Sequence, residues 1–134
     1  MKKRLVGAGI AVLALMAVLP AALPAARSAQ TVNVSLSEFK IKGVPAKLKT
    51  GATTFVVKNA SKQFPHNITV LYGPVHFKTA EQMKPGSTQK VTANLKPGAY
   101  ILACTVGFGF HASQGMITRF TVGTFDFTTF KWKA

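Results

Sequence analysis

The chain has 134 residues, with 17 Lys and Arg against only 3 Asp and Glu, and a formal net charge of +14. This length allows one domain with a single hydrophobic core, since a typical domain has about 100 to 150 residues. The acidic residues Glu38, Glu81 and Asp126 are too few and too scattered for paired-carboxylate hydrolysis, carboxylate-rich Mg²⁺ or Ca²⁺ sites, or most Ser/His/Asp arrangements. A single cysteine, Cys104, excludes an internal disulfide.

Residues 1–29 have the layout of a secretory signal peptide. A basic start at 2–4 precedes an uncharged apolar run at 5–19, and 20–29 is rich in small residues and proline. An uncleaved membrane anchor is the alternative, because the uncharged stretch reaches Ala26 and approaches the length that spans a bilayer, although two prolines argue against it. We therefore expect a periplasmic or otherwise exported protein whose mature chain keeps 13 basic and 3 acidic residues, a charge of +10.

From residue 30 onward, short segments in which apolar and polar residues alternate predict one strand after another. We expect strands at 31–39, 53–59, 66–72, 88–95, 99–105 and 116–122. Turn sequences such as Lys-Pro-Gly separate them. This number and spacing predict an all-β fold, an antiparallel β-sandwich. The segment 73–83 breaks the alternation and is expected to hold a loop or one short helix, and no other helix is expected.

The predicted domain covers residues 30–123, and 124–134 forms a C-terminal extension. The extension is rich in aromatic residues, which lie beside Lys131 and Lys133. One interpretation is an extra edge strand or an apolar flap on the sandwich. The other is a docking or membrane-surface element, because aromatic rings next to lysines suit an anionic interface.

The residues with metal-binding chemistry gather in the segment 100–116, YILACTVGFGFHASQGM. It contains Cys104, His111 and Met116 in the spacing C-x6-H-x4-M. A loop that joins two antiparallel strands brings all three to one end of the sandwich. His66 lies at that end too, if its strand runs in the same direction as the one that starts at Met116.

These four side chains offer a thiolate, two imidazoles and a thioether. That set is the ligand set of a blue-copper electron-transfer centre, in which the methionine is a weak axial ligand. Catalytic zinc also uses one Cys and two His, but it needs an open water position and usually a nearby acid or base, and no carboxylate is close in sequence.

The stretch 32–122 resembles a cupredoxin, the small blue-copper family. The matching pieces are GATTFVVKN at 51–59, Pro65-His66-Asn67, and KPGAY at 96–100 leading into Cys104. In familiar members fewer than six residues separate the cysteine from the second histidine, so the loop is longer here.

The resemblance implies a Greek-key sandwich with one type 1 copper ion at one end. The ion would be held by His66, Cys104 and His111, with Met116 as a long axial ligand. Asn67 would hydrogen-bond across to the cysteine loop and hold the two ligand segments together.

Taken alone, each of these residues has an ordinary explanation. Cys104 could be a buried thiol or an intermolecular disulfide partner, Met116 a core residue, and the histidines loop or strand-end residues. Their order and their placement at strand ends together favour copper. His76 is interpreted as a loop histidine, and Met83 as a loop or rim residue and not a ligand.

The implied function is the carriage of single electrons between redox partners, without enzymatic activity. By resemblance, the edge of His111 reaches the surface through an apolar patch, for which Phe108, Phe110, Pro65 and Phe64 are the candidates. An alternative for the rings at 108 and 110 is that they fill the end of the core.

Other functions remain open at this stage. The same fold and ligands suit a periplasmic copper-handling or delivery protein, a cupredoxin-like accessory subunit of a larger oxidoreductase, or a binding module that has lost tight metal binding. Met83 and Met116 are the only methionines of the mature chain, so there is no Met-rich run of the kind expected for copper storage.

The charge predicts the partner. A strongly basic protein attracts an acidic redox protein such as a c-type cytochrome or an oxidase domain, or makes a peripheral contact with a membrane surface. Nucleic acid is not expected, because the lysines are spread along the whole chain and the protein is exported. We expect a monomer.

Overall fold

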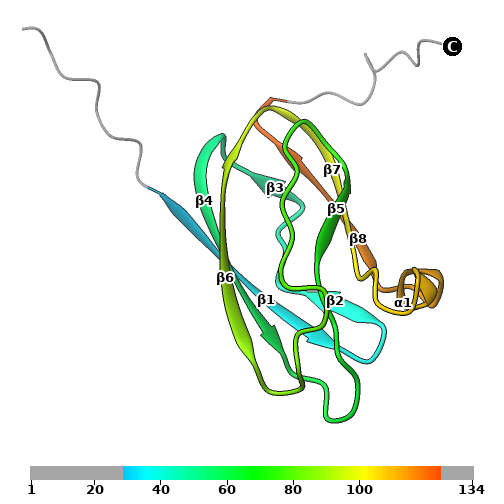
Figure 1. The fold of residues 1–134 in the computed structure, drawn as a ribbon. Coiled ribbons are helices and arrows are strands. Elements are labelled where there is room, and N and C mark those ends of the chain that lie inside the picture. The colour runs from blue at the N-terminus through cyan, green and yellow to red at the C-terminus, as the bar shows by residue number, and fades with distance from the viewer. Residues whose placement is uncertain (1–28, 125–134) are drawn as a thin grey trace, which may run out of the picture.

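The computed structural model describes residues 29–124, and Figure 1 shows two layers of strands that face each other. One sheet has the strand order β2-β1-β4-β6 and the other β3-β8-β7-β5. The elements are β1 (Gln30–Ser37), β2 (Lys40–Lys42), β3 (Lys47–Leu48), β4 (Gly51–Asn59), β5 (Thr69–Tyr72), β6 (Thr88–Leu95), β7 (Gly98–Ala103), α1 (Phe110–Ser113) and β8 (Ile117–Val122). Within these residues, no helix has the length and apolar character needed to cross a bilayer.

The predicted β-sandwich is confirmed, and each sheet also contains one parallel pair of strands. β1 pairs with β4 in parallel, as β3 does with β8, whereas the other pairs are antiparallel. The parallel pairs arise because the chain leaves one sheet for the other between the two strands, so that it returns in the same direction. Strands that are consecutive in sequence and joined by a hairpin are antiparallel, so the sequence pattern alone does not predict the two parallel pairs.

The core lies between the sheets and follows the alternation of the sequence. Val32, Val34 and Leu36 of β1 are at most 3% exposed, while the residues between them face outward. The rings of Tyr100 and Phe120 stack across β7 and β8 with centroids 4.8 Å apart. The inward residues of both sheets therefore form one continuous apolar layer.

The predicted start of the strand at 66–72 was wrong, whereas a loop, one of the two expectations for 73–83, is confirmed. β5 begins at Thr69 and not at residue 66, because His66 and Met83 form an isolated antiparallel bridge ahead of the strand. The segment 73–83 contains no helix: it runs as a loop beside β5, where the Val70 N–H donates to the Phe77 carbonyl at 3.1 Å.

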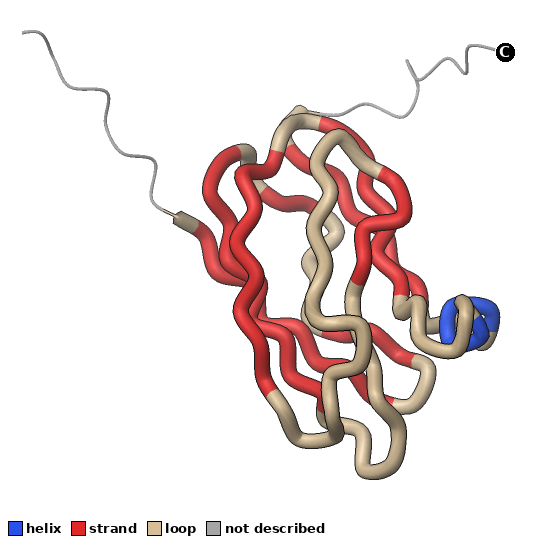
Figure 2. Tube along the Cα trace, in the orientation of Figure 1, coloured by secondary structure: helices blue, strands red, loops and turns tan. Residues whose placement is uncertain are grey.

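A helical turn appears where none was expected, in the long loop after Cys104 (Figure 2). Gly107, Phe108 and Gly109 have φ angles of 68°, 55° and 87°, so three consecutive residues are left-handed. They reverse the chain and start α1 at Phe110. Glycine adopts this conformation readily, but a bulky side chain such as Phe108 does not.

The predicted gathering at one end of the sandwich is confirmed. β5 and β8 are both antiparallel to β7, so they run in the same direction. Cys104 follows β7 directly, and His66 precedes β5. The predicted signal peptide at 1–29 and the predicted extension at 124–134 lie almost wholly outside the described residues.

Candidate metal centre

Three side chains with metal-binding atoms meet at this end. His66, Cys104 and His111 are all buried, and their ligand atoms lie within 4.8 Å of one another. The His66 Nδ1 is 3.1 Å from the His111 Nδ1, and the Cys104 Sγ is 3.4 Å from the His111 Nδ1 and 3.8 Å from the His66 Nδ1. The structure thus brings together three of the four predicted ligands.

This triangle fits a metal ion. A point equidistant from its three corners lies about 2.0 Å from each atom, and metal–imidazole bonds are about 2.0–2.1 Å long. Two imidazoles and one thiolate in a trigonal arrangement are the equatorial donors of a blue-copper site. The donor set and its geometry therefore suit copper.

Met116, the predicted axial ligand, is fully buried beside Cys104. It directly precedes β8 and does not open that strand as predicted. The β7–β8 register, in which Ala103 faces Ile117, continues by one step because the Cys104 N–H donates to the Met116 carbonyl at 3.0 Å. Side chains of cross-strand neighbours lie about 4.5–5.5 Å apart at Cβ, so the thioether belongs to the immediate surroundings of the thiolate.

The backbone also ties His111 to this pair. His111 lies in α1, and its carbonyl accepts the Met116 N–H at 3.0 Å. The left-handed turn and α1 take up the extra residues of the loop, so that a six-residue spacing still returns the imidazole to Cys104.

Asn67 connects the two ligand segments, as the resemblance implied. Its Oδ1 accepts the Thr105 N–H at 2.8 Å, and its Nδ2 donates to the Glu81 carbonyl at 2.9 Å and to the Thr105 Oγ1 at 3.0 Å. Its own N–H points at the Cys104 Sγ, 3.4 Å away. This predicted bridge is confirmed, and it fixes the position of the thiolate relative to His66.

Burial shapes the chemistry of His66. Desolvation lowers the pKa of His66, the neighbouring His111 lowers it further, and Glu38 raises it. The lowered pKa favours the neutral imidazole, the form that binds a metal. The other ring nitrogen, Nε2, is buried without a hydrogen-bond partner among the described residues.

Aromatic rings surround His111, which is 7% exposed. The ring centroids of Phe39, Phe64 and Phe110 lie 5.3, 6.3 and 6.2 Å from that of His111. Phe64 and Phe110 were predicted as rim residues. Phe108 is fully exposed and Phe110 56% exposed, so the interpretation that they fill the core was wrong.

Sequence reasoning missed Phe39. It lies in the tight turn between β1 and β2 with a φ of 53°, and it packs closer to His111 than either predicted ring. The one signal available was an aromatic residue at the end of the predicted strand 31–39.

The structure also shows where His76 and Met83 lie, the two residues that were not predicted to be metal ligands. His76 is exposed, with its Nδ1 3.5 Å from the Val70 carbonyl, and it lies outside the cluster, in line with a loop histidine. Met83 is only 2% exposed, so the rim interpretation was wrong. Its N–H and carbonyl pair with those of His66, and this pairing draws it into the core.

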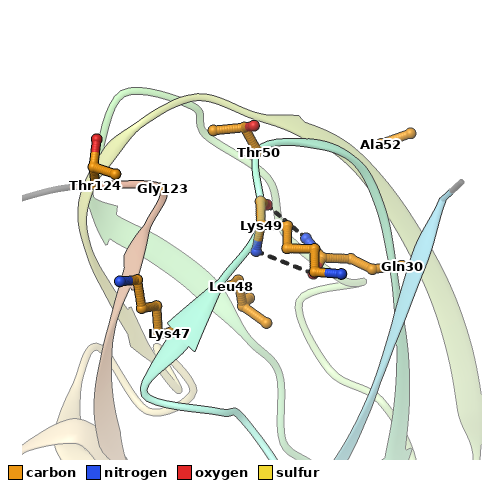
Figure 3. Close-up of a pocket in the computed structure, with 8 residues that line it drawn as sticks. All are labelled: Gln30, Lys47, Leu48, Lys49, Thr50, Ala52, Gly123 and Thr124. Atoms are coloured by element: carbon orange, nitrogen blue, oxygen red, sulfur yellow. Dashed lines mark hydrogen bonds between the residues drawn. The ribbon is translucent and has the colours of Figure 1, made fainter. Parts of the chain in front are cut away.

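A separate hollow of about 680 Å³ lies at the opposite end (Figure 3). It is formed where β1 begins and β8 ends. The Gln30 side chain lies on one side of it, where its Nε2 donates to the Lys49 carbonyl at 2.6 Å and its Oε1 accepts the Lys49 N–H at 3.2 Å. None of the clustered ligands lines it.

Comparison with known proteins identifies the family. A family model described as a cupredoxin-like domain matches residues 9–118, and the chain belongs to this family.

Solved structures agree on the fold. The chain is similar to reduced auracyanin of the photosynthetic bacterium Roseiflexus castenholzii, with a TM-score of 0.58 and 20% identity over 70% of this chain and 97% of that one. It is also similar to auracyanin A, a "blue" copper protein of Chloroflexus aurantiacus, with a TM-score of 0.56 and 17% identity over 72% and 100% of the two chains.

The curated relatives are longer proteins. The chain is 32% identical over 75 residues to the iron uptake system component EfeO of Yersinia pestis, which covers 56% of this chain and 20% of that protein. The corresponding protein of Escherichia coli strain K12 is 30% identical over 73 residues, 54% of this chain and 19% of its own length. The chain thus matches about a fifth of these relatives.

Proposed function

We propose that the protein is an exported small blue copper protein that carries single electrons between redox partners and is not an enzyme. The observation that carries this proposal is the buried triangle of two Nδ1 atoms and one Sγ, whose centre lies about 2.0 Å from all three. A copper ion bound there supplies one-electron redox chemistry.

The chain's own residues favour fast transfer by holding the donors rigidly. The Asn67 bridge fixes the His66 and Cys104 segments, and the backbone hydrogen bonds of Met116 fix the loop that carries His111. The donor atoms should therefore keep their positions in both oxidation states of the metal. The rings of Phe39, Phe64 and Phe110 exclude water from His111. They also offer a partner protein an apolar surface next to the site, and the central part of a protein–protein interface is typically apolar.

Substitution of the rim tests this role. Phe110→Asp is expected to slow electron transfer to an acidic c-type cytochrome roughly tenfold, because a carboxylate both removes apolar contact and repels the partner. Stopped-flow absorbance of the copper band measures the rate. Leu71→Asp is the matched control, since Leu71 is 50% exposed on β5 and makes the same charge change away from the rim. Equal slowing by both variants would remove the rim from the transfer path.

Salt tests the acidic partner. The positive charge of the protein should speed the encounter at low ionic strength, so the same rate should fall as salt shortens the Debye length from about 30 Å at 0.01 M to about 8 Å at 0.15 M. A rate that rises with salt would indicate a basic partner.

The axial position gives a further prediction. Met116→Leu should keep the copper and its colour while raising the reduction potential, because a weak donor to the oxidised ion is lost and the buried volume is nearly conserved. Redox titration followed at the visible band measures this shift. An unchanged potential would mean that the sulfur of Met116 makes no contact with the metal.

The second candidate is a copper-handling or delivery protein, or an accessory domain of a larger metal system. Similarity to iron uptake components favours a role in metal traffic. The buried cluster offers one thiolate and two imidazoles but no carboxylate. These ligands suit copper better than metal ions that prefer oxygen ligands. Rapid transfer of the metal itself to a competing copper chelator would support delivery, whereas slow metal release with fast electron exchange would support the carrier.

A further inference from the structure

The outer face of the sheet β2-β1-β4-β6 gathers lysines that are far apart in sequence. In each strand the alternate residues that do not face the core point to this side, and four of them are exposed lysines: Lys40, Lys42, Lys58 and Lys90. We call these four the basic patch. Their neighbours on the face are Ser, Thr and Asn residues and the half-buried Val56.

The strand registers show how closely the patch is set. Ser35 of β1 pairs with Lys42 on one side and Lys58 on the other, so these two lysines stand in one row, two strands or about 10 Å apart. Lys90 faces Val56, which places it diagonally next to Lys58.

The patch lies in the half of the face nearest the candidate metal centre. Lys58 directly precedes Asn59, whose Nδ2 donates to the Phe64 carbonyl at 3.0 Å and to the Met83 carbonyl at 2.8 Å. The far half of the face carries rows of Thr, Ala and Asn without a lysine: Thr31, Thr54 and Thr92, then Ala52 and Asn94.

Of the two described carboxylates, one is paired with a lysine outside the patch and the other lies at the edge of the patch. Glu81 is paired with Lys78 at 3.2 Å, the one ion pair found within residues 29–124. Glu38, next to β2, accepts the Ser61 hydroxyl at 2.7 Å, and hydrogen bonds led by this one lower the pKa of Glu38, so it stays ionised at neutral pH. Apart from Glu38 at its edge, the patch presents uncompensated positive charge.

The face offers charge without an apolar anchor. The exposed large apolar residues of the described chain all lie elsewhere, on the metal-centre loops and the other sheet: Phe64, Leu71, Tyr72, Phe108, Phe110 and Ile117. A protein interface usually depends on buried aromatic or Arg anchors. Attraction to anionic lipid headgroups requires only cationic side chains near the surface.

We propose that the basic patch binds an anionic lipid surface. With this face on the bilayer, the end of the sandwich that carries His111 points along the membrane plane and stays open to a redox partner there. The proposal goes beyond the electron-carrier function and does not depend on it, because the lysines are not metal ligands and the copper-free protein should bind equally.

The test is sedimentation of the exported protein with vesicles of phosphatidylcholine that contain about one third phosphatidylglycerol, at low salt. The variant K42Q/K58Q/K90Q should bind roughly a hundredfold more weakly, since each lysine near an anionic surface contributes about fivefold. Vesicles of pure phosphatidylcholine should not bind the protein.

The control variant is K47Q/K49Q/K96Q, which removes the same charge from exposed lysines at the opposite end, two of them seen in Figure 3. It should weaken binding by no more than about fivefold. Circular dichroism of the copper-free protein shows that both variants fold. Equal weakening by the two triple variants, or no weakening by either, would overturn the proposal. So would a patch variant that slows transfer to an acidic cytochrome while it binds vesicles normally, because the patch would then be a protein-binding surface.

Discussion

Cys104→Ser is expected to abolish the intense visible band of the copper-loaded protein. The band arises from charge transfer between a thiolate and the oxidised ion, and Cys104 is the one cysteine of the chain. The serine oxygen is nearly isosteric, so the buried site keeps its shape while its soft donor is lost. Absorption spectroscopy with a metal assay on the same sample measures the result.

Two histidine variants control this experiment. His76→Ala should keep the band, because His76 is exposed and outside the cluster. His111→Ala should lose it or change it strongly, since the His111 Nδ1 lies 3.4 Å from the Cys104 Sγ. The opposite pattern, with colour lost in the His76 variant and kept in the His111 variant, would show that the second imidazole is wrongly assigned.

Asn67→Ala is expected to destabilise the protein by about 2–4 kcal/mol. It removes four side-chain hydrogen bonds at a residue that is 3% exposed and leaves the Thr105 N–H without its acceptor. A buried polar group left unpaired costs about 1–3 kcal/mol, and the lost bonds add to this. Denaturant unfolding of the copper-free protein measures the change in the free energy of unfolding.

The same variant should release copper faster, because the bridge between the His66 and Cys104 segments is gone. Asn94→Ala is the matched control: Asn94 is exposed on β6, and its loss should change stability by no more than about 0.5 kcal/mol. If the two variants were equally stable, Asn67 would not be the clamp that its contacts indicate.

The sequence by itself determined the kind of fold and the kind of site. Alternation with a period of two shows which side of each strand faces the core, and it holds in β1 and β4 nearly residue by residue. The ligand types of Cys104, His111 and Met116 are fixed by the sequence, and a loop between antiparallel strands must bring them to one end. Side-chain chemistry and local periodicity are properties of short segments, so they can be read without the fold.

The tertiary structure alone decided which distant residues meet. Phe39 contacts His111 because a left-handed residue turns the β1–β2 hairpin toward the metal centre, and no local pattern specifies that direction. Met83 became a core residue through its bridge to His66. Lysines that are far apart in sequence form a patch because β1 and β4 are paired in parallel, although the chain passes through the other sheet between them. Such contacts depend on strand order and loop direction, which are set by the packing of the whole chain.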